Sequence, residues 1–309
     1  SLSIFDSVEN RLDSITDRGD PRRPNEDASG GAANCAFVID GATGLGDNII
    51  DESESDAAWL AKFAAVTFEE DALAGCAVAA SVRKINERVS RIIGDLAGST
   101  PVEPWNLPCA GFQMIRVEKS GIVSHGLGDC RLFLQDAAGA TRALSAIEGG
   151  AAAENEEAKR AVAHAGGLSK FSSLSTEPEI RAELRRRRAL YNTDGGSVWT
   201  LGANPKAAVH VVSHPLPATL PAYGLLCTDG FAALVDLYGR YDAASLIERA
   251  RTDGLVPLLA ELRAIEQRED PDGQTYPRFK VSDDATAVLF EIVEDRAVSG
   301  RRSTARPRA

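Results

Sequence analysis

The sequence predicts an α+β fold in which helices pack on a β-sandwich. Three observations support this class: an apolar strand near the start, two long helical patterns directly after it, and further short strands on either side of an insertion. Paired helices between blocks of strands have to stack in layers to bury their apolar faces. A chain of 309 residues, 44% of them hydrophobic, can build such a core without covalent cross-links.

The first half of the chain contains a strand, two helices and a meander. The apolar run 36–39 ends in Asp40-Gly41, which predicts a buried strand followed by a turn. A helix over 51–73 starts with acidic residues that suit the positive end of its dipole, and one over 78–96 has apolar residues at three-to-four spacing. An antiparallel meander of short strands is then expected at 109–117, 121–126 and 131–135.

The segment from 145 to 207 differs in composition and is interpreted as a variable insertion. It is rich in Ala and Glu, then in Ser, then strongly basic at 185–188, and it predicts two helices with exposed linkers. The arginine run favours a solvated helix face over a phosphate site. Trp199, near the end of the insertion, is expected to be a packed side chain.

The last third returns to strands and helices. Strands are expected at 209–212, 224–227 and 285–292, with helices that begin near Phe231 and cover 243–250 and 255–266. Because no clean linker separates these blocks, we predict one domain over 1–295. The Arg-rich tail, 296–309, lacks large apolar residues and is expected to be disordered.

Composition excludes several classes of protein. A formal net charge of -11 argues against a nucleic-acid binder, and no apolar stretch is long enough to span a membrane. The five cysteines form no CxxC pair, so we interpret them as small buried hydrophobes in a reducing cytosol. With four histidines and no HExxH spacing, a metal site must rest on carboxylates, which favour Mg²⁺, Mn²⁺ or Ca²⁺ over Zn²⁺.

Acidic residues recur where apolar strands end or begin. Asp40, Asp129 and Asp229 follow strands, Asp283-Asp284 precedes the last strand, and Glu26-Asp27 precedes the first. Strand ends can converge at one edge of a sheet system, where carboxylates form a site for hard cations. Each acid alone could be a turn residue or a cap, since Asp-Gly is a common turn dipeptide. The prediction depends on their joint order.

Five segments occur in the order typical of one enzyme family: Arg22-Arg-Pro-Asn-Glu-Asp27, Ala36-Phe-Val-Ile-Asp-Gly41, His125-Gly-Leu-Gly-Asp-Cys-Arg131, Leu225-Leu-Cys-Thr-Asp-Gly230 and Ser282-Asp-Asp-Ala-Thr286. The chain thereby resembles the metal-dependent protein phosphatases of the type 2C serine/threonine class, as a divergent bacterial-like member. The resemblance spans about residues 13–292 and implies a four-layer α-β-β-α fold, with a central antiparallel β-sandwich flanked by helix pairs.

The resemblance also implies the ligands of a two-metal site. Asp40 would bridge two Mn²⁺ or Mg²⁺ ions, and the Gly41 carbonyl would bind one of them. Asp229 and Asp283 would complete the pair of sites. The family spacing favours Asp283 over its neighbour Asp284 as the ligand.

Four further roles follow from the same resemblance. Glu26 would act through a metal-bound water, and Asp27 would support that corner of the metal site. Asp129, together with Asp229, could hold a third and weaker metal. Arg22 would clamp the substrate phosphate through parallel charge-assisted hydrogen bonds, with its neighbour Arg23 as the alternative.

The implied reaction is hydrolysis of a phosphomonoester by a hydroxide that bridges the two metals. The favoured substrates are phosphorylated proteins, and the alternatives are a small phosphorylated metabolite or a non-catalytic signalling module with the same fold. The chain departs from the family in having Ala42-Thr43-Gly44 where His-Gly-Gly or Met-Gly-Gly is common. No histidine stands at that place to protonate the leaving group, so the leaving-group acid is unassigned, with a metal-bound water and His125 as candidates. We expect a cytoplasmic monomer that binds neither nucleic acid nor membranes.

Overall fold

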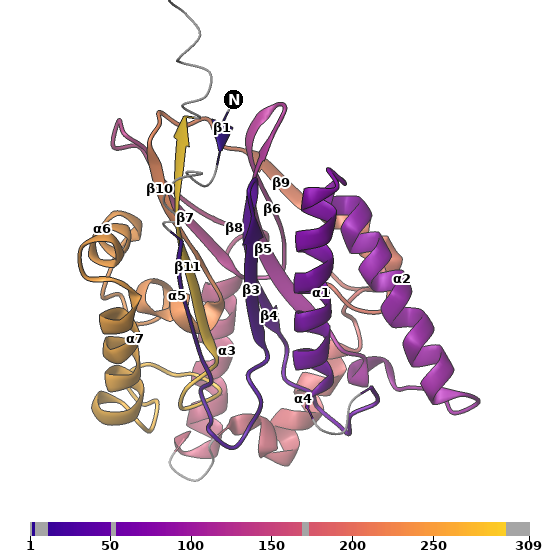
Figure 1. Cartoon of the computed structure of the whole chain (residues 1–309). Coiled ribbons are helices and arrows are strands. Elements are labelled where there is room, and N and C mark those ends of the chain that lie inside the picture. Colours follow the sequence, from indigo (N-terminus) through magenta and orange to yellow (C-terminus); the bar gives the residue numbers. More distant parts are fainter. Residues whose placement is uncertain (1, 4–11, 51–53, 169–172, 295–309) are drawn as a thin grey trace, which may run out of the picture.

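The computed structural model describes residues 2–3, 12–50, 54–168 and 173–294 (Figure 1). Two antiparallel β-sheets form the middle of this part, and helices cover the outer face of each sheet (Figure 1). The four-layer α-β-β-α class with a central antiparallel β-sandwich is thus confirmed. The expected tail lies outside the described residues.

The first sheet has five strands in the order β3-β4-β5-β6-β9. Their bounds are β3 Asp27–Ala32, β4 Cys35–Gly41, β5 Ala110–Glu118, β6 Gly121–Leu127 and β9 Val212–Pro215. Strand β4 is buried on both faces: Phe37 and Ile39 face helices, whereas Ala36 and Val38 face the other sheet. This double burial explains why its sequence is a continuous apolar run rather than an alternating one.

The second sheet has the order β1-β11-β10-β7-β8, and β2 also pairs with β11. Its strands are β1 Leu2–Ser3, β2 Asp13–Asp17, β7 Arg131–Gln135, β8 Thr141–Ser145, β10 Ala222–Cys227 and β11 Ala285–Glu294. Leu132, Leu226 and Phe290 of this sheet pack against residues of the first sheet in a shared apolar layer.

Seven α-helices lie outside the sheets in the described part of the chain. They are α1 Asp56–Leu73, α2 Val78–Ala97, α3 Gly150–Ala165, α4 Pro178–Arg188, α5 Asp229–Asp236, α6 Ala243–Asp253 and α7 Leu255–Ala264. Short 3-10 or π turns cover Pro104–Asn106, Leu174–Thr176, Pro205–His210 and Ile265–Glu269. Helices α1 and α2 cover the five-stranded sheet, and α5, α6 and α7 cover the other.

The predicted insertion forms its own small structure at one end of the sandwich (Figure 1). Both expected helices are present as α3 and α4, and Val162, Leu174 and Ile180 share a small core there. The last part of the insertion is held against α2 by Asn86. The buried side chain of Asn86 forms hydrogen bonds with the backbone of Thr200, Gly202 and Asn204. This anchor fixes the insertion against the sandwich.

Several predicted boundaries were wrong, for reasons visible in the sequence. The strand expected at 209–212 begins later, because Pro205–His210 form a 3-10 helix. The observed strand is β9, which begins at Val212. Strands β2, β3 and β8 were not predicted, because their sequences are short, polar or rich in small residues and lack apolar alternation. Helix α1 begins at Asp56 after the cap Ser55, whereas residues 51–53 lie outside the described part.

Other expectations can be checked against burial. All five cysteines are free, and every one except Cys76 is buried, as expected for small apolar side chains. Trp199 is buried and stacks on His210 with 3.9 Å between ring centroids, which confirms that it is packed. Among the helices that the structure describes, none combines the length and apolarity needed to cross a membrane.

Candidate metal centre

The strand ends that carry the predicted acids meet at one end of the sandwich. Strand β10 ends at Cys227, which pairs with Arg131 at the start of β7 and with Ala287 near the start of β11. Asp129, Asp229 and Asp283 lie just beyond these three strand ends, so the antiparallel register brings them to the same edge. The end of β4, with Asp40, lines the same cavity.

Close backbone contacts explain the glycine of both Asp-Gly pairs. A Cβ at Gly41 would lie 2.5 Å from the carbonyl oxygen of Glu26, and one at Gly230 would lie 2.0 Å from that of Asp284. Neither glycine has the left-handed backbone that makes glycine favourable in turns. These glycines are therefore needed because two chain segments touch, and the contact at Gly230 brings Asp229 beside Asp283.

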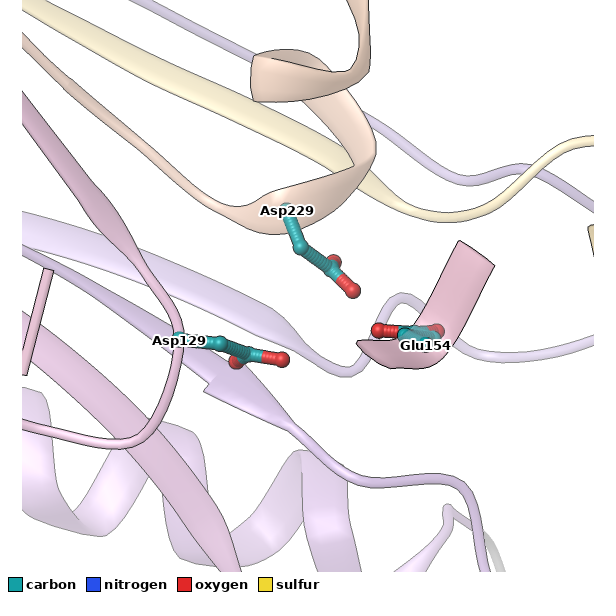
Figure 2. Close-up of side chains that lie close together, drawn as sticks. All are labelled: Asp129, Glu154 and Asp229. Atoms are coloured by element: carbon teal, nitrogen blue, oxygen red, sulfur yellow. The ribbon is translucent and has the colours of Figure 1, made fainter. Parts of the chain in front are cut away.

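A cluster of carboxylates lines a cavity of about 1050 Å³ at this edge. Asp129, Glu154 and Asp229 each point one carboxylate oxygen into a common space, and these atoms lie within 4.8 Å of one another (Figure 2). The carboxyl groups of Asp40 and Asp229 interact directly, and this interaction favours a proton on Asp40. Two carboxyl groups can attract each other only through a proton, and a bound cation would take that proton's place.

The protonation behaviour of the cluster reflects its lack of cation partners. Burial, followed by the carboxylates of Asp229 and Asp27, raises the pKa of Asp40 well above its ordinary value. Burial and Asp229 raise the pKa of Asp129 to about 7. Within the described residues, no Lys or Arg side chain forms an ion pair with Asp40, Asp129 or Asp229. Such clustered acids attract cations because each added negative charge is unfavourable without them.

Glu154 is a member of the cluster that the sequence analysis missed. It belongs to α3, in the insertion, and its carboxyl group reaches the cavity opposite Asp129 and Asp229 (Figure 2). Although Glu154 is exposed, the protein atoms around its carboxyl group partly desolvate it, and this, followed by the charges of Asp229 and Asp129, raises its pKa above the ordinary value. In sequence it resembles any other glutamate of a solvated helix, so no local signal distinguishes it from Glu156 or Glu157.

A chain of polar contacts links Glu26 to Asp283. The hydroxyl of Thr43 donates to Glu26 Oε2 at 2.7 Å and accepts from Lys280 Nζ at 3.1 Å. The same Lys280 ammonium lies 2.6 Å from Asp283 Oδ1. Burial alone would lower the pKa of Lys280, but the charge and hydrogen bond of Asp283 raise it above its ordinary value. Neither Thr43 nor Lys280 was singled out from the sequence.

Asp27 and Asp284 are held by hydrogen-bond donors from the protein. Asp27 Oδ2 accepts from the hydroxyls of Thr228 and Thr286 at 2.8 and 2.7 Å. Asp284 accepts from the backbone N–H groups of Gly19 and Glu26 at 3.0 and 2.7 Å, one at each oxygen. Asp283, by contrast, lines the cavity. This placement favours Asp283 over Asp284 as the residue that faces a metal.

Two residues predicted from the resemblance lie away from the cavity. The Arg22 side chain is 74% exposed and forms a bidentate pair with Asp20, with both N–O distances at 2.9 Å. His125 on β6 bonds Ser213 through Nδ1 and Glu118 through Nε2, each at 2.7 Å. His125 does not line the cavity, so the structure gives it no position from which to protonate a leaving group there.

Comparisons with known proteins give a result for the fold. No family model and no curated protein sequence matches the chain. The solved structures it matches include the phosphatase MsPP from Mycobacterium smegmatis in complex with cacodylate, at 17% identity and a TM-score of 0.51 over 90% of this chain and 97% of that one. The chain has the fold of the PPM serine/threonine phosphatases. The fold that the five motifs imply is thus supported.

Two other solved structures have the same phosphatase fold. PppA, a regulatory component of the type VI secretion system of Pseudomonas aeruginosa, is 18% identical with a TM-score of 0.51, over 92% of this chain and 96% of its own. The catalytic domain of the phosphatase PstP, solved with two manganese ions, is 16% identical with a TM-score of 0.51, over 92% of this chain and 98% of its own. At these identities the likeness concerns the fold.

The residues at the sandwich edge of this phosphatase fold suit hard divalent cations. Asp129, Glu154 and Asp229 each offer a carboxylate oxygen to the common space, and oxygen is the ligand type that Mn²⁺ and Mg²⁺ prefer. Glu26 Oε1 is buried and has no hydrogen-bond partner among the described residues. A buried carboxylate oxygen without a donor is costly, and a cation or its water shell would satisfy it.

Proposed function

We propose that this protein is a metal-dependent phosphomonoester hydrolase whose substrates are phosphoserine and phosphothreonine residues of proteins. The observation that carries the proposal is a set of carboxylates without cation partners at the edge of a serine/threonine phosphatase fold. The wide cavity in front of these carboxylates leaves room for a phosphorylated side chain. Bound divalent cations lower the pKa of a shared water and offset charge on the phosphoryl oxygens.

Each residue of the site has a distinct task in this proposal. Asp40, Asp229 and Asp283 hold the two Mn²⁺ or Mg²⁺ ions, together with the backbone carbonyl of Gly41. Glu26, fixed by the Thr43 hydroxyl, orients water at the same corner. Asp27 does not touch the substrate, because its hydrogen bonds to Thr228 and Thr286 join the starts and ends of three strands.

We further propose that a third and weaker cation binds between Asp129, Glu154 and Asp229. The proximity of their carboxylate oxygens supports this assignment, and so do the raised pKa values of Asp129 and Glu154. Glu154 comes from the insertion, so this cation would couple the position of α3 to the sandwich. The free cysteines are consistent with work in a reducing compartment, for which we propose the cytoplasm.

The test is an assay of phosphomonoesterase activity with Mn²⁺, Mg²⁺ and chelator, followed by phosphoserine, phosphothreonine and phosphotyrosine peptides. We expect activity that needs Mn²⁺ or Mg²⁺ and prefers the first two peptides. Turnover of small phosphate esters without turnover of any peptide would favour a metabolite phosphatase. Metal binding without turnover of any substrate would contradict the enzyme and favour a non-catalytic signalling module.

A further inference from the structure

The four consecutive arginines at the end of α4 have different surroundings. Arg186 is 69% exposed and pairs with Glu183, so the expected solvated face describes it well. Arg187 lines the cavity but is bound by Glu157 and Glu183. Arg185 stacks on Trp105, with its Cζ 3.9 Å from the ring centroid, and donates to the carbonyl of Leu45. For these three, the guanidinium already has partners in the protein.

Arg188 is the member of this run whose guanidinium is least engaged. It lines the cavity that contains the carboxylate cluster. Its Nη1 donates one long hydrogen bond, 3.3 Å, to the carbonyl of Thr43, and its Cζ lies 5.6 Å from the ring centroid of Tyr191. Among the residues that the structure describes, no carboxylate forms an ion pair with it. Arg188 also contacts the side chain of Cys109, where its charge opposes the rise in the pKa of that thiol that burial causes. Because it binds no carboxylate there, the guanidinium keeps donors available toward the acidic cavity.

The contact with Thr43 places Arg188 at a defined corner of the site. The backbone carbonyl of Thr43 holds Arg188, while the Thr43 hydroxyl holds Glu26. Arg188 and Glu26 are therefore bound by the same residue, two positions after Gly41. The guanidinium thus belongs to α4 of the insertion and contacts the segment that follows β4.

Phosphate is the ligand that best fits such a group. A guanidinium presents parallel N–H donors that match two phosphate oxygens, and it cannot lose its charge. Arg22, the phosphate-binding residue implied by the resemblance, already spends both parallel donors on Asp20. We propose that Arg188 binds the phosphate group of the substrate from the insertion side. This inference rests on the proposed function and adds a residue for which the five motifs have no counterpart.

The experiment compares Arg188→Met with Arg186→Met. The second variant is the control, because it also replaces an arginine of α4 but one that does not line the cavity. The main readout is the inhibition constant of inorganic phosphate against a chromogenic phosphomonoester with Mn²⁺. We expect Arg188→Met to raise the inhibition constant of phosphate about 10- to 100-fold, which is the range for losing charge-assisted hydrogen bonds. Arg186→Met should change this constant less than about twofold. Arg188→Lys keeps the positive charge but lacks the two parallel N–H donors of a guanidinium, so its inhibition constant should lie between those of the two Met variants.

Two controls separate phosphate binding from a structural role. The melting temperature and the calorimetric affinity for Mn²⁺ should be the same for Arg188→Met and Arg186→Met. If the wild type is active and phosphate inhibits it and both Met variants equally, the role of Arg188 is overturned while the proposed function stands. A loss of Mn²⁺ affinity in Arg188→Met alongside weaker phosphate inhibition would also overturn that role. If Arg188→Met does not fold, unchanged phosphate inhibition in Arg188→Lys overturns it. A wild type without phosphatase activity would overturn the proposed function and this inference together.

Discussion

Asp283 and Asp284 are neighbours in sequence, yet they belong to two different regions of the molecule. Asp284 faces inward, where its two oxygens accept the backbone N–H groups of Gly19 and Glu26. Asp283 faces the cavity, where its nearest side-chain partner is the ammonium of Lys280. The same contrast separates Asp27, which accepts two threonine hydroxyls, from Asp40, which is hydrogen-bonded to another carboxyl group.

The difference distinguishes acids that stabilise the fold from acids that are available to bind a cation. A carboxylate that receives two protein donors has its charge stabilised and serves as a joint between segments. Burial raises the pKa of Asp27, Asp284 and Asp40 alike. Hydrogen bonds from the protein partly offset that rise at Asp27 and Asp284, whereas at Asp40 the charges of Asp229, Asp27 and Asp129 add to it. Substitutions of single residues and a change of pH should affect the two kinds of acid differently.

The largest effect is expected for a cavity acid. Asp229→Asn removes a proposed ligand of all the cation sites, so Mn²⁺-dependent activity should fall by more than about 100-fold. Substituting even the residues that only support metal ligands lowers metal affinity or activity by about 10- to 100-fold. The metal-free variant should be at least as stable as the wild type, because one unfavourable charge is gone. Activity assays and thermal unfolding with chelator check this. Destabilisation with activity retained would place Asp229 in the structural region.

The opposite pattern is expected for a structural acid. Asp284→Ala leaves the N–H groups of Gly19 and Glu26 without their acceptor, which should lower the free energy of unfolding by about 1–3 kcal/mol. Denaturant unfolding of the metal-free protein measures this loss. A variant as stable as the wild type would remove the distinction between Asp283 and Asp284.

Lys280 tests whether an internal cation competes with metal at the cavity. Lys280→Met removes the ammonium that pairs with Asp283, so Mn²⁺ should bind about fivefold more tightly, as expected for an ion pair worth up to about 1 kcal/mol. Lys62→Met, which removes the pair with Glu54 on the surface of α1, is the matched control and should leave the affinity unchanged. Weaker Mn²⁺ binding after Lys280→Met would mean that Lys280 helps to form the site.

The smallest effect concerns pH. The ordinary pKa of Asp129 is 3.8, and its pKa in the folded protein is about 7. Between these values the folded protein keeps a proton that the unfolded chain has lost, so the free energy of unfolding falls as pH rises from about 4 to 7. With chelator, we expect a melting temperature about 2–4 °C lower at pH 7.5 than at pH 5. Asp129→Asn should flatten this slope, and an equal slope in both proteins would contradict the assignment.

Much of this division could be predicted from the sequence, because it depends on where strands end. Asp40, Asp129 and Asp229 directly follow apolar strands, and the antiparallel register then brings them together. Glu154 and Arg188 could not be found this way. They lie on helices of the insertion, where acids and arginines are ordinary on a solvated face, and only the packing of α3 and α4 against the sandwich turns these two side chains to the cavity.

The strand errors have a related cause. Strand β3 consists mainly of small residues, and Gly30 is one of them because a Cβ there would lie 2.6 Å from the Phe37 ring. Such close contact between a strand and its neighbour removes the apolar alternation by which strands are recognised. The same is true of the two Asp-Gly pairs, whose glycines reflect contact between distant segments rather than a turn.

The most direct test is the number of Mn²⁺ ions that the intact protein binds, measured by isothermal calorimetry at pH 7.5. If the cavity acids await cations, the wild type will bind at least two ions per chain, and Asp229→Asn will lose at least one of them. The Asp284→Ala variant, measured at a temperature where it remains folded, will keep the wild-type number. An intact protein that binds no Mn²⁺, or an Asp229→Asn variant that binds as the wild type does, would contradict the metal centre.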